Sequence, residues 1–313
     1  MIEPLRPLSI GELLDRTFSL YRQNFKLFIG VSVLGPAALL CSQMALAAVG
    51  VGSATHSAGV IQNQVSIIAT VSAGMIFYLL GHSISMAASV RAVAAVYLGK
   101  AIQIGEAYAS VKGHVLRVLG VVLSVMLIAG LGSGLIIGLG ALIMFIAISG
   151  GRGIAGQTGS VVGGIFGTVA LIALILVAIG FAVRYAFSVQ ACVVEDLTVG
   201  ASLKRSAVLA KNARKRVVTV FAVCMVIIYV VAFLFAALSQ FVPAGTSMFA
   251  RQLLTQITGL ISGVLGAPLM TIAMSLVYYD ERVRKEAFDL QLLMESLDEA
   301  KPADTSSVAS SLG

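Results

Sequence analysis

The sequence predicts an all-α polytopic membrane protein with six transmembrane helices, arranged as three pseudo-repeated units of a cytoplasmic interfacial helix followed by a transmembrane hairpin. Only 11% of its residues are charged and 58% are hydrophobic, whereas soluble domains carry roughly 25% charged residues. Six almost uncharged stretches are each long enough to cross a bilayer as a helix: residues 27–49, 65–90, 115–149, 161–183, 217–239 and 253–279. The basic residues cluster in alternate loops. Together these observations exclude an ordinary soluble domain.

The first apolar stretch, residues 27–49, is interpreted as a true span and not as a cleaved signal peptide. The charged region that precedes it and the apolar region itself are both long for a signal peptide. The third stretch, residues 115–149, would form a helix of roughly 50 Å, at ~1.5 Å per residue, against a hydrocarbon core of ~30 Å. Either one tilted, bent or protruding span or a span with a re-entrant segment would satisfy this length.

The distribution of charge predicts the orientation. Of the 21 basic residues, 19 lie within residues 1–26, 91–117, 184–216 and 282–301, and the other two are Arg152 and Arg251. Because basic loops stay in the cytoplasm, both termini are expected there. The basic pI of about 9.5 then reflects membrane orientation, and no nucleic-acid partner is expected.

Three amphipathic segments are expected to lie in the membrane interface. The first has a capping box, Ser9 with Glu12, and an apolar stripe at helical spacing that includes Phe18 and Tyr21. Similar patterns start near Gly105 and Gly200, so interfacial helices are predicted at about 9–26, 104–114 and 199–213. Each one leads into a hairpin of two spans, which indicates an internal repeat of about 95 residues. Residues 1–297 form one membrane domain, and residues 298–313 are expected to be disordered.

Three segments carry a family resemblance: "GELLDRTFSLYRQNF" at residues 11–25, "VVEDLTVGASLKRSAVLAKNARKRV" at 193–217 and "YYDERVRKEAFDLQLL" at 278–293. They resemble bacterial membrane proteins related to the glycerophosphoryl diester phosphodiesterase membrane domain. The third segment is the most specific of them. The resemblance implies a six-span fold in a bacterial inner (plasma) membrane. It supplies no reaction, because the phosphodiesterase activity of that family belongs to a separate soluble domain.

Basic residues near the predicted cytoplasmic surface are candidates for binding lipid headgroups. Arg91 and Arg184 lie near the inner ends of spans, where they could bind a lipid phosphate or extend to the interface in the ordinary way. Arg184 could also pair with Glu195 or Asp196. The full set of headgroup candidates is Arg16, Arg22, Lys26, Arg91, Arg184, Lys204, Arg205, Lys211, Arg214, Lys215 and Arg216.

His82 is the most unusual polar residue within a span, and Ser83 and Ser85 lie beside it. Ionisable residues at this depth are costly and often functional, so His82 could belong to a proton or substrate path. The alternative interpretation is a neutral imidazole that hydrogen-bonds a serine or a carbonyl of a neighbouring helix.

Glycines recur at four-residue spacing in three spans, which places them on one helix face and permits close approach of another backbone. The pattern indicates a glycine zipper for tight packing or for a homo-oligomer contact. A sliding interface or a pore wall is the alternative. The glycines are Gly130, Gly134, Gly138, Gly159, Gly163, Gly167, Gly259 and Gly263.

No pattern indicates an intramembrane enzyme. The sequence has no H-E-x-x-H motif and no Walker A loop. Its three histidines lie far apart, and Cys41, Cys192 and Cys224 have no metal-ligand spacing. No catalytic residue, metal or cofactor is therefore expected.

The sequence favours a non-enzymatic membrane scaffold or lipid-interacting protein whose basic cytoplasmic face contacts anionic headgroups. Protein partners or a homo-oligomer could form through the glycine faces. The alternative is a transporter or lipid permease with a path near His82, between spans two, three and four.

Overall fold

A computed structural model of the chain describes residues 8–55, 60–150, 157–211, 213–238, 241, 246–286 and 294. Within these residues the regular structure is helical and contains no strand. The helices are α1 (Ile10–Gln23), α2 (Phe25–Ser32), α3 (Leu34–Thr55), α4 (Val60–Tyr97), α5 (Ile104–Ala109), α6 (Val115–Gly150), α7 (Gln157–Arg184), α8 (Ser188–Val194), α9 (Val199–Ala210), α10 (Arg214–Leu238) and α11 (Met248–Glu286). The all-α class is confirmed.

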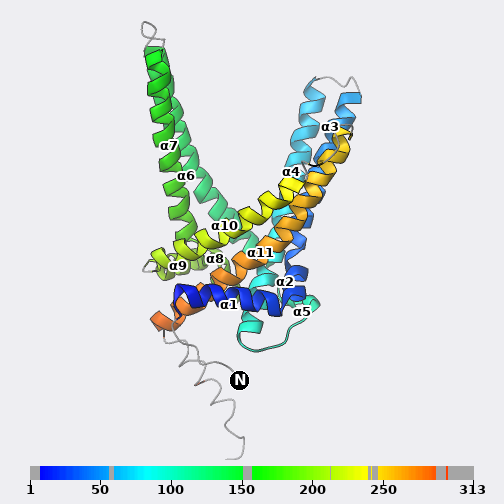
Figure 1. Cartoon of the computed structure of the whole chain (residues 1–313), viewed down its shortest axis with the longest axis vertical. Coiled ribbons are helices and arrows are strands. Elements are labelled where there is room, and N and C mark those ends of the chain that lie inside the picture. Colours follow the sequence, from blue (N-terminus) through cyan, green and yellow to red (C-terminus); the bar gives the residue numbers. More distant parts are fainter. Residues whose placement is uncertain are drawn as a thin grey trace, which may run out of the picture.

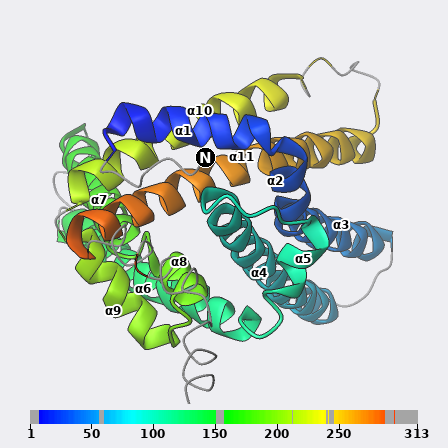
Figure 2. The same cartoon turned by 90° about the horizontal axis from the view of Figure 1, so that it is seen from below.

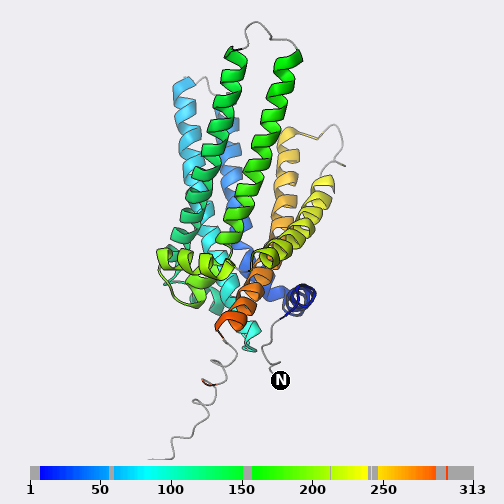
Figure 3. The ribbon, with the colours of Figure 1, turned by 90° about the vertical axis from the view of Figure 1, so that its left-hand side faces the viewer.

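The long helices pair as three hairpins, α3 with α4, α6 with α7 and α10 with α11. In Figure 1 the α6–α7 and α3–α4 hairpins diverge as two arms, and α10 and α11 cross between them. The short helices α1, α5, α8 and α9 gather where the arms meet (Figure 3). We call this the charged end; α11 also ends there, at Glu286. Seen from that end, α1 lies along α10 and α11 (Figure 2).

Six helical segments are long and apolar enough to cross a membrane, as expected, which fits a multi-pass membrane protein. Many apolar side chains on their outer faces are exposed, among them Leu127 at 63% and Phe233 at 72%. Exposed apolar faces of this kind are typical of surfaces that contact a membrane or another protein. The candidate spans are Phe25–Ala48, Gln64–Tyr97, Val115–Ile136, Ile172–Val194, Arg214–Leu238 and Ala250–Glu286.

The long third stretch is a single helix. α6 runs for 36 residues without interruption, roughly 54 Å at ~1.5 Å per residue. A re-entrant segment at residues 115–149 is therefore the wrong alternative, and the helix must tilt or protrude from the bilayer.

The first interfacial helix begins as predicted. Glu12 N–H donates to Ser9 Oγ (3.3 Å) and Ser9 N–H donates to Glu12 Oε2 (2.7 Å), so both halves of the capping box form. The helix ends three residues before the predicted boundary, because Asn24 leaves the helical region (φ −118°, ψ 35°) and α2 starts at Phe25. Phe18 and Tyr21 of the apolar stripe consequently lie on α1, whereas the next aromatic residues, Phe25 and Phe28, lie on α2.

The other two short helices lie within their predicted ranges but are shorter. α5 has only six residues, and Gln103 N–H donates to Glu106 Oε2 (3.0 Å) at its start. α9 ends at Ala210. Helix α8 was not predicted, and six of its seven residues are buried. Asp196, between α8 and α9, has a positive φ of 53°, a conformation that Asp tolerates better than most residues.

The end of the sixth span differs most from expectation. The predicted sixth span ends at residue 279, but α11 continues without a break through Glu286 and buries Asp280 and Glu281. Tyr278 and Tyr279 are among the largest fully buried side chains. The predicted disordered tail, residues 298–313, lies outside the described residues.

Candidate functional site

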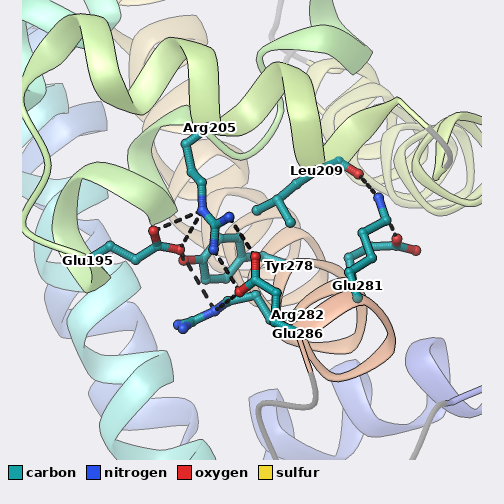
Figure 4. A network of polar contacts seen from close by, with 8 residues as sticks. Glu195, Arg205, Leu209, Tyr278, Glu281, Arg282 and Glu286 are labelled. Carbon is teal, nitrogen blue, oxygen red and sulfur yellow. Dashed lines mark hydrogen bonds and ion pairs between the residues drawn. The ribbon is translucent and has the colours of Figure 1, made fainter.

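The charged block at the end of α11 forms two clusters of ion pairs at the charged end. The first, which we call the neutral cluster, consists of Glu195, Arg205, Tyr278, Arg282 and Glu286 (Figure 4). Arg205 Nε donates to Glu195 Oε2 (2.9 Å), and Arg205 Nη1 lies 2.5 Å from Glu286 Oε1. The Tyr278 hydroxyl donates to Glu195, and Arg282 Nε lies 3.3 Å from Glu286 Oε2. Two guanidinium groups balance two carboxylates, and they join α9 and the α8–α9 turn to α11.

The electrostatics of the neutral cluster favour its ionised form. The hydrogen bond that Arg205 donates to Glu286 raises the pKa of Arg205 above its ordinary value, against the lowering effect of burial. The guanidinium thus stays charged at any physiological pH. On the exposed side of the same turn, Arg117 and then His114 hold the pKa of Asp196 below its usual range.

The second cluster, which we call the Asp280 cluster, connects α11 to α10 and to the start of α1. Asp280, 2% exposed, accepts at Oδ2 from Arg216 Nη1 (2.5 Å) and Arg284 Nε (2.9 Å). Its Oδ1 accepts from the backbone N–H of Leu8 (2.6 Å), and Arg284 Nη2 donates to Leu8 O (2.8 Å). Glu281 pairs with Arg216 (3.0 Å) and Lys285 (3.2 Å). The buried carboxylate of Asp280 on α11 therefore connects this helix to α10 and to the start of α1.

A cavity of about 460 Å³, which we call the basic pocket, lies beside the Asp280 cluster. Four cations surround it, while Asp280 and Glu281 supply two carboxylates, which leaves an excess of two positive charges. A pocket with this charge suits an anion. Its lining residues are Ile10, Ala213, Lys215, Arg216, Glu281, Arg284 and Lys285.

The predicted headgroup candidates fall into two groups: those whose side chains contact other residues of the fold, and those that are exposed. Arg205 and Arg216 are held by carboxylates of α11 or of the α8–α9 turn, Arg16 lies over the Tyr97 ring (5.7 Å), and Arg91 Nη2 lies 3.4 Å from His114 Nε2. The other candidates are exposed at or near the charged end: Arg22, Lys26, Arg184, Lys204, Lys211, Arg214 and Lys215.

The predicted pairing of Arg184 with Glu195 or Asp196 is wrong. Its guanidinium lies over the ring of Tyr185 (5.8 Å). Glu195 instead pairs with Arg205, and Asp196 pairs with His114 (2.9 Å) and Arg117 (2.5 Å).

Sequence reasoning missed the carboxylates and cations of α11 as site residues. The available signal was the pair of i, i+4 spacings, Asp280 with Arg284 and Glu281 with Lys285, directly after an uncharged span. Oppositely charged side chains at this spacing stabilise a helix. The pattern favours continuation of α11 over its end at residue 279.

A second cavity, of about 500 Å³, surrounds His82 and lies among α2, α3, α4 and α11. It is lined by spans one, two and six, whereas the alternative function expected from the sequence has a path between spans two, three and four. The His82 ring stacks on Tyr78 (5.5 Å between centroids). Ser83 donates to Leu79 O of its own helix (2.7 Å), and Ser85 donates to Val31 O of α2 (2.9 Å). Among the described residues, no serine or carbonyl hydrogen-bonds His82, contrary to the simpler expectation.

The glycine prediction is wrong within the chain for four positions. A Cβ placed on Gly130, Gly134, Gly138 or Gly259 would meet no atom within 4 Å. Gly263 fits better, because its Cβ would lie 3.4 Å from Pro36. The surroundings of the remaining three, Gly159, Gly163 and Gly167, lie outside what the structure describes.

Other glycines permit close helix packing. A Cβ on Gly81 of α4 would lie 2.6 Å from Ala38 Cβ and 3.2 Å from Leu34 O, both on α3. A Cβ on Gly132 would lie 2.7 Å from the Phe181 ring on α7. Neither Gly81 nor Gly132 belongs to the series of glycines at four-residue spacing that suggested the zipper.

Within the described residues, no group of three or more His, Cys, Asp or Glu side chains is placed to hold a metal ion. Cys41 is exposed, Cys192 and Cys224 are buried, and all three are free thiols.

No family model matches the sequence. Comparison with curated proteins gives no match. No solved structure matches the chain either.

Proposed function

We propose that the protein is a non-enzymatic scaffold of the bacterial inner membrane whose charged end binds anionic lipid headgroups at the cytoplasmic surface. The observation that carries this proposal is the basic pocket, in which four cations are balanced by only two carboxylates. Each Lys or Arg near an anionic membrane surface contributes about 1 kcal/mol to binding. The exposed bases at the charged end would add to the attraction.

The placement of α1 supports an interfacial role for the charged end. This helix lies beside the basic pocket, to which it contributes Ile10, and exposes Phe18 at 42%. A capped helix with a basic and an aromatic side is suited to the boundary between headgroups and acyl chains. The three short helices and three hairpins are compatible with the proposed repeat of interfacial helix plus hairpin. The proposed relationship to the glycerophosphoryl diester phosphodiesterase membrane domain rests on the three sequence segments alone.

The headgroup proposal is tested best at Lys215, which lines the basic pocket, is exposed and makes no ion pair with the described residues. Lys215→Gln is expected to weaken retention of phosphatidylglycerol about fivefold, the equivalent of about 1 kcal/mol. The measurement is mass spectrometry of lipids that stay bound after detergent extraction from mixed phosphatidylglycerol and phosphatidylcholine vesicles. Arg251→Gln, on α11 at the opposite end, is the control and should retain the wild-type amount. Equal retention by wild type and Lys215→Gln would reject the basic pocket as the binding site.

The proposed orientation makes a separate prediction. Green fluorescent protein fused after residue 313 should fluoresce in cells, and alkaline phosphatase fused after residue 154 should be active, because the former folds in the cytoplasm and the latter outside it. The converse pattern would place the charged end outside the cytoplasm and contradict the proposal.

A further inference from the structure

The cavity around His82 combines a neutral lining with unused hydrogen-bonding groups. None of the described residues that line it is Asp, Glu, Lys or Arg. Its polar side chains include Gln43 on α3, Tyr78 and His82 on α4, and Gln256 on α11. None of these four side chains hydrogen-bonds another described residue. All four side chains are half-buried, and water is scarce inside a membrane span, so the lining suits a ligand that is uncharged and accepts hydrogen bonds.

The cavity is open to the apolar surface of the bundle. Leu39 on α3, 38% exposed, and Gly259 and Ala267 on α11, also exposed, are among its lining residues. Near Gly259 the outer face of α11 carries Ile257 and Ile261, each 39% exposed. These positions belong to candidate spans one and six. A ligand could therefore enter sideways from the hydrocarbon of the bilayer.

Gly259 leaves space for such a ligand. Gly259 lines the cavity, and a Cβ built on it would meet no atom within 4 Å. The position is therefore open, and the cavity volume of about 500 Å³ lies within the usual range of ~300–1,000 Å³ for ligand pockets. Any larger side chain at this position would extend into the cavity without displacing a backbone.

We propose that the cavity around His82 binds the uncharged glycerol-ester region of a membrane lipid together with part of one acyl chain. The ester carbonyls accept hydrogen bonds, which the imidazole, phenol and amide groups can donate. The apolar remainder of the lining, such as Leu39, Leu260 and Met270, contacts the acyl chain. This site is separate from the basic pocket and does not depend on headgroup binding.

The test uses diacylglycerol with a photoreactive diazirine on one acyl chain, mixed into phosphatidylcholine vesicles that contain the full-length protein. After illumination, mass spectrometry should locate the label on α3, α4 and α11 around His82. Gly259→Leu should strongly reduce this labelling, because the leucine side chain would occupy part of the cavity. Gly130→Leu is the matched control: its glycine is also exposed with no atom within 4 Å of a Cβ, but it lies on α6 outside the cavity, and labelling should be unchanged.

Two measurements keep the result interpretable. Thermal unfolding in detergent shows whether Gly259→Leu folds, and Ala267→Leu, at the other exposed lining position of α11, replaces it if it does not. Competition with unlabelled diolein should displace the probe, whereas hexadecane should not. Unchanged labelling in a folded cavity variant, label spread evenly over the exposed faces of α6 and α7, or equal displacement by hexadecane would each overturn the proposal.

Discussion

Replacing Asp280 by alanine is expected to destabilise the protein by about 3–5 kcal/mol, the usual cost of removing one partner of a buried ion pair. Asp280 accepts from Arg216, Arg284 and the backbone N–H of Leu8, and its side chain is 1% exposed. Alanine would leave both guanidinium groups with one carboxylate fewer and would remove the hydrogen bond between Leu8 and α11. Asp280→Asn retains an acceptor for Leu8 and is expected to show an intermediate loss.

Two of the free cysteines provide the measurement. Cys192 and Cys224 are buried and Cys41 is exposed, so in a Cys41→Ser background a thiol-reactive fluorophore reports unfolding as the buried thiols become accessible. Asp196→Ala is the control, because this carboxylate also contacts two cationic side chains but is 65% exposed. Its Tm should change much less, since exposed ion pairs contribute little. Equal losses for Asp280→Ala and Asp196→Ala would show that burial of the Asp280 cluster does not stabilise the fold.

Adding a single methyl group at Gly81 is expected to destabilise the α3–α4 hairpin by about 1–3 kcal/mol, the typical cost of overpacking. The new Cβ would lie 2.6 Å from Ala38 Cβ and 3.2 Å from a backbone oxygen, Leu34 O. Neither atom is the end of a flexible side chain, so α3 must move away from α4. Loosening this contact would also disturb the cavity around His82, which both helices line.

Gly130→Ala is the matched substitution for Gly81→Ala. Its Cβ would meet no atom within 4 Å, and alanine has a higher helix propensity than glycine by about 1 kcal/mol. The Tm of this variant, measured with the same fluorophore, should be equal to or above that of the wild type. A large loss at Gly130 together with tolerance at Gly81 would restore the glycine zipper and contradict the packing described above.

The six spans could be predicted from the sequence because apolar length is a property of each segment alone. The capping box at Ser9 was equally local, and it formed as expected. Helix α8 could not be identified in this way, since its residues merge with the preceding span and its burial depends on contacts with α4, α6 and α9.

The site residues depended on packing partners that local patterns do not specify. Local apolar length ends the sixth span at residue 279, yet Asp280 and Glu286 are paired with Arg216 and Arg205, and Asp280 also binds the start of α1. The four-residue spacing places the glycines of α6 on one helix face, but within the described residues a Cβ at Gly130, Gly134 or Gly138 would meet no atom within 4 Å. His82 was identified by its rarity in a span. Its position beside a cavity required the folded arrangement of spans one, two and six.

The most direct test of the central claim is the lipid composition that co-purifies with the wild-type protein from vesicles of equal phosphatidylglycerol and phosphatidylcholine content. If the excess positive charge of the basic pocket binds anionic headgroups, phosphatidylglycerol should be enriched in the bound fraction, and the enrichment should fall as salt screens the pocket. A bound fraction with the same composition as the vesicles, at low and high salt alike, would contradict the account.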